Sequence, residues 1–144
     1  MTVVFDTSTL APAIVPASDS RRLIDRLVAA DIGLCVSQPI FDELRDVLAR
    51  PRTRRWHCRN DAEILAFVNL VGRLFLVTPG VIEVSGLVPE DPDDDMVLAA
   101  AAEIQADYVV SEDAHLLRLQ TLGHVEIVSR ATMHAILDRL GVPR

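Results

Sequence analysis

The sequence contains no lysine, and this absence removes some phosphate-handling classes of protein. All 14 basic residues of the 144-residue chain are arginines. A standard P-loop needs a lysine that reaches the β- and γ-phosphates of a nucleotide, and the glycine-rich dinucleotide fingerprint is also missing. The chain is therefore not expected to bind nucleotides through either motif.

Aromatic residues and cysteines are also scarce. Aromatic side chains make up only 4% of a chain that is 50% hydrophobic, so leucine, valine, isoleucine and alanine must fill the core. This balance is typical of a compact α/β or helical protein, and the length predicts a single domain over residues 1–144. Two cysteines, Cys35 and Cys58, provide neither a disulfide framework nor a zinc site. No stretch resembles a membrane span or a signal peptide, which predicts a cytoplasmic protein.

Charge is abundant but unevenly distributed. The net charge of −7 discourages non-specific attraction to nucleic acid. Five of the fourteen arginines nevertheless fall in "RPRTRRWHCRN", residues 50–60, while the densest acidic run is "EDPDDD", residues 90–95. The chain can therefore present a basic surface and an acidic surface in different places.

Apolar runs alternate with segments of helical spacing. Strands are predicted at about 2–6, 32–37, 73–78, 107–111 and 124–129, and helices at about 19–30, 38–50, 60–72, 91–105, 114–120 and 131–140. Alternation of this kind predicts a three-layer α/β/α sandwich around a mainly parallel sheet. Ligands of such sheets bind at the carboxyl ends of the strands.

Two predicted strands end in acids. Asp6 follows the apolar run "VVF", and Ser111, Glu112 and Asp113 follow "DYVV". Aspartate is depleted in strands and costly to bury without a partner. Each residue taken singly could be a turn or cap residue. Two carboxylates delivered to one edge of a parallel sheet, however, repel each other unless a cation lies between them.

Two further segments offer carboxylates to the same edge. On the helix that begins after Ser37, Glu43 borders the apolar stripe, whereas Asp42 and Asp46 point to the solvated side. In "DPDDD", either Asp94 or Asp95 could turn inward, although acids at a helix start are often only caps. Four acids from four separate elements favour a metal site, and a site built of oxygens alone suits Mg²⁺ or Mn²⁺.

These residues resemble the signature of the PIN domain family, a family of metal-dependent ribonucleases that includes the VapC-type toxins. "VVFDTS" matches its first strand with Asp6, and "SQPIFDELRDVL" matches its helical glutamate with Glu43. "DPDDDMVLAAAAEIQADYVVS" matches the third acid with Asp94, and "SEDAHLL" matches the last with Asp113. The closest likeness is to the branch described as toxin components of toxin–antitoxin systems.

Two positions depart from the pattern of that branch. Asp95 stands where an asparagine is common, so Asp94 and Asp95 could exchange roles. Glu112 adds a negative charge beside the site, where it could tune metal affinity or repel the phosphates of a substrate.

The resemblance implies hydrolysis of RNA phosphodiesters with Mg²⁺ or Mn²⁺. Asp6 and Asp113 would be direct ligands, Asp94 would complete the set, and Glu43 would bind through water. Ser8 and Ser111 would orient the carboxylates. The implied partners are an RNA substrate, a small antitoxin protein and a second copy of the chain. The alternative is an inactive PIN fold that binds RNA or protein without cutting.

Other families with related acids fit less well. "FDTST" is similar to the nucleophile motif of haloacid-dehalogenase-like phosphatases, and aspartate clusters on a parallel sheet are similar to phospho-receiver domains. Both normally need a lysine at the phosphoryl group. No histidine has ligand-like spacing, although His115 closely follows Asp113.

The arginine cluster has three possible roles. Arg52, Arg54 and Arg55 could contact RNA phosphates, with Trp56 as a stacking surface for bases. The segment could instead be a solvated connection between helices, or it could dock an acidic partner.

Overall fold

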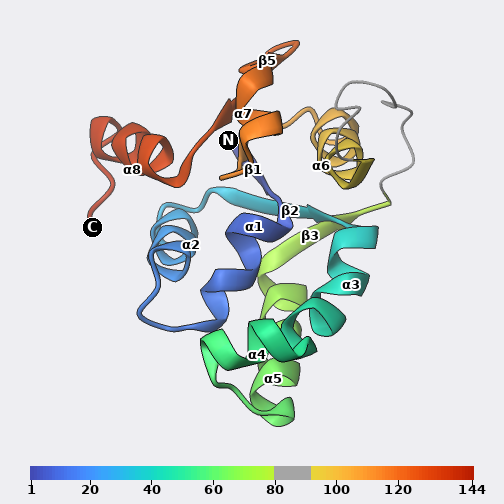
Figure 1. Ribbon diagram of the computed structural model, residues 1–144. Coiled ribbons are helices and arrows are strands. Elements are labelled where there is room, and N and C mark those ends of the chain that lie inside the picture. The colour runs from blue at the N-terminus through green and yellow to red at the C-terminus, as the bar shows by residue number, and fades with distance from the viewer. Residues whose placement is uncertain (80–91) are drawn as a thin grey trace.

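A six-stranded sheet with the order β3-β2-β1-β4-β6-β5 forms the centre of the computed structural model (Figure 1). The structure describes residues 1–79 and 92–144, with the side chains of 1–79 and 96–144. The strands are β1 (Thr2–Phe5), β2 (Gly33–Ser37), β3 (Phe75–Thr78), β4 (Tyr108–Val110), β5 (Thr121–Leu122) and β6 (Val125–Val128). All strand pairings are parallel except that of β5 with β6.

Strand β1 lies between β2 and β4. Val4 is in register with Cys35 on one side and with Val109 on the other, and all three side chains are fully buried. From β1 the chain continues outward to β2 and β3 in one direction, whereas β4 and β6 extend the sheet in the other. The order of strands therefore reverses between β1 and β4. A crevice for a ligand is expected at the carboxyl ends of these two strands.

Helices cover both faces of the sheet. They are α1 (Thr7–Leu10), the 3₁₀ helix η1 (Ala11–Ile14), α2 (Asp19–Ala29), α3 (Gln38–Ala49), α4 (Pro51–His57), α5 (Asp61–Leu74), α6 (Pro92–Glu103), α7 (Ala114–Leu119) and α8 (Arg130–Arg139). Figure 1 shows α1, α3, α4 and α5 below the sheet and α6 above it. The predicted three-layer α/β/α architecture is confirmed. No helix in residues 1–79 or 92–144 is both long and apolar enough to cross a membrane.

Helix α3 follows directly from its local sequence. The Ser37 hydroxyl accepts a hydrogen bond from the backbone N–H of Ile40 at 3.3 Å, and Pro39 lies in the first turn where no N–H is needed. Ile40, Leu44 and Leu48 are buried at helical spacing. The cap, the apolar stripe and the end before Pro51 agree with the prediction.

Four short elements, α1, η1, α4 and β5, were not predicted from the sequence. No helix was predicted at residues 51–57, for which a solvated connection was one of three possible roles; Pro51 occupies the first turn of α4, and Cys58 ends it with a left-handed φ of 58°. No helix was predicted in the α1–η1 segment. Strand β5 is only two residues long and pairs with β6 through a turn in which Gly123 has a φ of 60°.

Arg26 joins helix α2 to helix α8 and to the last residues of the chain. Its guanidinium is 5% exposed and donates to the Asp138 carboxylate at 2.7 Å and to the Val142 carbonyl at 2.8 Å. It also contacts His134 Nδ1 at 2.8 Å and donates to the Pro143 carbonyl at 3.1 Å. A lysine cannot reproduce this planar set of donors.

We expect Arg26→Ala to lower the free energy of unfolding by about 1–3 kcal/mol, because it leaves the buried Nδ1 and carbonyl oxygen of His134 without their donor. Arg144→Ala is the matched control, since Arg144 pairs with the same Asp138 at 2.6 Å but is 68% exposed. That variant should lose much less stability than Arg26→Ala, because an exposed ion pair is screened by solvent. Urea denaturation measures both, and equal losses would contradict the assigned role of Arg26.

Candidate metal centre

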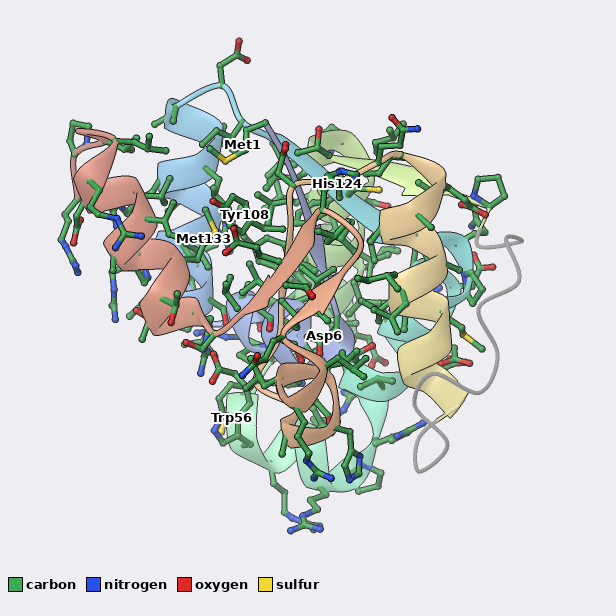
Figure 2. All side chains as sticks on the ribbon, turned by 90° about the horizontal axis from the view of Figure 1, so that it is seen from above. Met1, Asp6, Trp56, Tyr108, His124 and Met133 are labelled. Carbon is green, nitrogen blue, oxygen red and sulfur yellow. The ribbon has the colours of Figure 1, made fainter. Side chains whose placement is uncertain are left out.

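Asp6 ends strand β1 and caps helix α1. Its side chain is only 4% exposed. Oxygen Oδ1 accepts hydrogen bonds from the backbone N–H of Thr9 at 3.0 Å and from the Ser8 hydroxyl at 2.8 Å. The Ser111 hydroxyl donates to Oδ2. Asp6 thus does cap a helix, the alternative role considered for it, and its carboxylate is held in one orientation at the carboxyl end of the central strand (Figure 2).

Ser111 connects the ends of β1 and β4. Its hydroxyl donates to Asp6 and accepts a hydrogen bond from the backbone N–H of Asp113 at 2.9 Å. A second link runs from the Thr9 hydroxyl to the Val110 carbonyl at 3.1 Å. The structure therefore brings Asp6, Ser8 and Ser111 into one cluster, with Asp113 attached through its backbone.

Burial dominates the electrostatics of Asp6. Removal from water raises the pKa of the Asp6 carboxyl above its ordinary value of 3.8, and hydrogen bonds from Ser111, Ser8 and Thr9 only partly oppose this shift. A nearby cation would favour the ionised form. The site thus holds a carboxylate that is costly to charge when no cation is present.

Asp113 is the second carboxylate at this edge. It caps helix α7 by accepting a hydrogen bond from the backbone N–H of His115 at 2.8 Å, and its side chain is 28% exposed. The His115 ring lies beside it, with Nδ1 at 3.6 Å from Asp113 Oδ1. Asp113 therefore faces solvent from the same edge of the sheet that buries Asp6.

The other two predicted acids are placed by their helices. Glu43 is exposed on α3, which starts at the carboxyl end of β2, and its side chain forms no hydrogen bond with any residue in 1–79 or 96–144. Helix α6 packs against β1 and β4 and precedes a parallel strand, so its first turn lies at the carboxyl edge. Asp94 and Asp95 belong to that turn, but their side chains lie outside the described residues.

The Glu112 side chain turns toward Arg130, while its backbone N–H donates to the Ser8 hydroxyl at 3.4 Å. Its Oε1 accepts hydrogen bonds from the backbone N–H of Arg130 at 2.8 Å and from Arg130 Nε at 3.2 Å. Arg130 also donates to the Ser20 hydroxyl at 2.8 Å and so connects the β4–α7 turn to helix α2. The extra negative charge found in the sequence is therefore opposed by an arginine and by the first turn of α8.

The donor set fits a hard divalent cation. Asp6 and Asp113 supply carboxylate oxygens, the ligand type that Mg²⁺ and Mn²⁺ prefer. Within residues 1–79 and 96–144, no three histidine, cysteine, aspartate or glutamate side chains form a group that could hold a metal ion. Completion of the site therefore requires water, substrate or the acids that open α6.

The model of the PIN domain matches residues 2–115, from β1 into helix α7. This chain belongs to the PIN domain family. The fold is similar to a chain in the "Crystal structure of VapBC2 from Rickettsia felis bound to a DNA fragment from their promoter". The TM-score is 0.63 at 11% identity, over 90% of this PIN domain protein and 98% of that chain. No curated protein matches the sequence.

Two residues of this PIN domain site were not singled out from the sequence. Thr9 donates its backbone N–H to Asp6 and its hydroxyl to Val110. The spacing of three residues after a capping aspartate was a signal for the first contact. Arg130 had no such signal, because it lies 18 residues beyond Glu112 and reaches it only through the fold.

In metal-free protein we expect the stability of Asp6→Asn, relative to that of wild type, to be greater at neutral than at acidic pH. The pKa of Asp6 is raised in the folded state, so wild-type stability is complete below about pH 3.8 and falls as pH rises through the folded pKa. The asparagine does not titrate and escapes this loss. Urea unfolding in EDTA, at several pH values from acidic to neutral, measures the difference in the free energy of unfolding between the variant and wild type. A difference that is independent of pH would contradict the prediction.

Proposed function

We propose that this PIN domain protein is an endoribonuclease that hydrolyses RNA phosphodiesters with Mg²⁺ or Mn²⁺. The observation that carries the proposal is the buried Asp6 carboxylate, joined through Ser111 to the backbone of Asp113 at the point where the strand order reverses. Such a carboxylate is costly unless a cation shares the edge. Membership of the PIN domain family supports the same chemistry.

Asp6, Asp94 and Asp113 would hold the ion, with Glu43 acting through water and Asp95 as the alternative to Asp94. When bound, the ion supplies a water of lowered pKa and stabilises the leaving oxygen of the phosphodiester. Ser8 and Ser111 fix the Asp6 carboxylate before any ion arrives, because both hydroxyls donate to it. The pairing of Glu112 with Arg130 reduces its repulsion of a substrate phosphate.

We further propose that the protein is the toxin of a bacterial type II toxin–antitoxin pair in the cytoplasm. The structural neighbour is a VapBC2 complex, which supports a small antitoxin protein as partner. A homodimer is proposed on the resemblance to VapC-type toxins. The alternative is an inactive module that binds RNA or protein. The two experiments that follow distinguish it from a nuclease.

Calorimetric titration with Mn²⁺ should give saturable binding to the metal-stripped protein. We expect Asp6→Asn and Asp94→Asn to abolish or strongly weaken it, and Ser111→Ala to weaken it by about 10–100-fold because the Asp6 carboxylate loses its orienting donor. Asp46→Asn, which changes an exposed acid on α3, is the control and should bind as wild type. Absence of binding to wild type would count against a preformed metal site.

RNA cleavage tests the reaction itself. Incubation of total bacterial RNA with the protein and Mg²⁺ should yield discrete fragments that EDTA suppresses. Asp6→Asn and Asp113→Asn should reduce cleavage by at least about 100-fold, while Asp46→Asn should cut at the wild-type rate. Far-ultraviolet circular dichroism checks that the variants fold. Cleavage by Asp6→Asn at the wild-type rate would refute the assignment of this site.

A further inference from the structure

Helix α4 presents an arginine-rich face that the candidate metal centre does not use. Arg52, Arg55 and Trp56 stand at positions i, i+3 and i+4, so they share one side of the helix. All three are exposed, and the Trp56 side chain is 59% exposed. This indole is the only tryptophan of the chain, and burial is the usual fate of so large an apolar ring.

The opposite side of α4 is anchored to the fold. His57 is 4% exposed, its Nε2 lies 2.8 Å from the Leu48 carbonyl, and its Nδ1 accepts the backbone N–H of Arg59 at 2.8 Å. Nδ1 can accept only when it carries no proton, so Nε2–H donates to Leu48. The face of Arg52, Arg55 and Trp56 is thus held outward by a buried hydrogen-bonded residue at the end of the same helix.

The arginines of this region fall into two groups. Arg54 pairs with Asp61 at 2.5 Å, and Arg59 pairs with Glu63 at 3.4 Å. Within the described parts of the chain, Arg52 and Arg55 form no ion pair. Their charges are therefore available to an external anion, in a protein whose net charge is −7.

The location of α4 relates it to the candidate metal centre. Helix α3 starts at Gln38, directly after β2 ends at Ser37, and only Arg50 separates its last residue from α4. In Figure 2, Asp6 lies near the centre and Trp56 lies below it, on the side away from Met1, where β1 begins. A polymer bound along α4 would therefore lie on the side of the sheet where the strands end.

We propose that the face formed by Arg52, Arg55 and Trp56 binds single-stranded RNA outside the metal centre. The indole stacks on a base, and the two guanidinium groups bind flanking phosphates. This inference rests on the proposed function, because it takes RNA as the substrate and adds where a strand is held. An acidic peptide would satisfy the two arginines, but a base also supplies the planar partner that the exposed indole lacks.

Fluorescence provides a direct test because Trp56 is the sole tryptophan. Titration in EDTA with a mixed pool of 2′-O-methyl oligoribonucleotides of about twelve nucleotides keeps the probe uncut and independent of metal. We expect saturable quenching of tryptophan emission. With fluorescein-labelled probe, anisotropy should show Trp56→Ala binding about tenfold or more weakly, while Trp56→Phe keeps a stacking ring and stays closer to wild type.

The charge contribution is tested with matched double variants. R52A/R55A should reduce the slope of log affinity against log salt by about 1.4, since each lost phosphate contact removes about 0.7 on a single strand. R73A/R139A removes two exposed arginines elsewhere and brings the net charge to the same −9, down from −7. It should leave the slope near wild type. Equal effects of the two double variants would overturn the proposal, as would full affinity in Trp56→Ala.

The same titration with a polyglutamate peptide distinguishes a protein partner. Quenching by the peptide and not by RNA would overturn the RNA assignment and identify α4 as a site for an acidic segment. Failure of this inference is distinct from failure of the proposed function. If the wild type cleaves RNA and the α4 variants bind RNA as well as the wild type, only the role of α4 is refuted. If RNA binds through α4 but the protein neither binds metal nor cleaves RNA, only the nuclease activity is refuted.

Discussion

Burial of the Asp6 carboxylate is the constraint on which the rest of the site depends. An ionised group that is 4% exposed is tolerated only when its oxygens have partners, and here those partners come from two strands. Ser8 and Thr9 follow β1 directly, whereas Ser111 ends β4. Pairing of β1 with β4 is therefore a condition for a stable Asp6, and it also brings Asp113 to the same edge.

The chain separates its charges in a way that suits a polyanionic substrate. The acids at the carboxyl edge repel phosphate, and Arg130 offsets one of them by pairing with Glu112. Two arginines that form no ion pair within the described parts of the chain, Arg52 and Arg55, lie on α4 beside Trp56. Because the whole molecule carries an excess of negative charge, an RNA strand is attracted only to such local basic surfaces. The positions of these surfaces therefore determine where a strand can bind.

Local signals predicted the long elements and also the short helix α7, but they failed on α4, on the α1–η1 segment and on β5. Helix α3 carries a serine cap, an early proline and an apolar stripe, all within 14 residues, Ser37 to Arg50. Helix α4 has seven residues, too few to be stable from propensity alone, and depends on the contact of His57 with Leu48. Strand β5 depends likewise on its pairing with β6. Elements that are stabilised by residues distant in the sequence carry few local signals that would predict them.

The sequence by itself determined which strands end in acids, the order of Asp6, Glu43, Asp94 and Asp113, and the clustering of arginines at 50–59, because these features are local. Tertiary structure alone decided that Ser111 reaches Asp6, that Glu112 turns toward Arg130, and that Glu43 is exposed with no partner among residues 1–79 and 96–144. The physical reason is the order of the strands. A periodic pattern shows which face of a strand is buried, but the neighbour of that strand is selected by the packing of the whole chain.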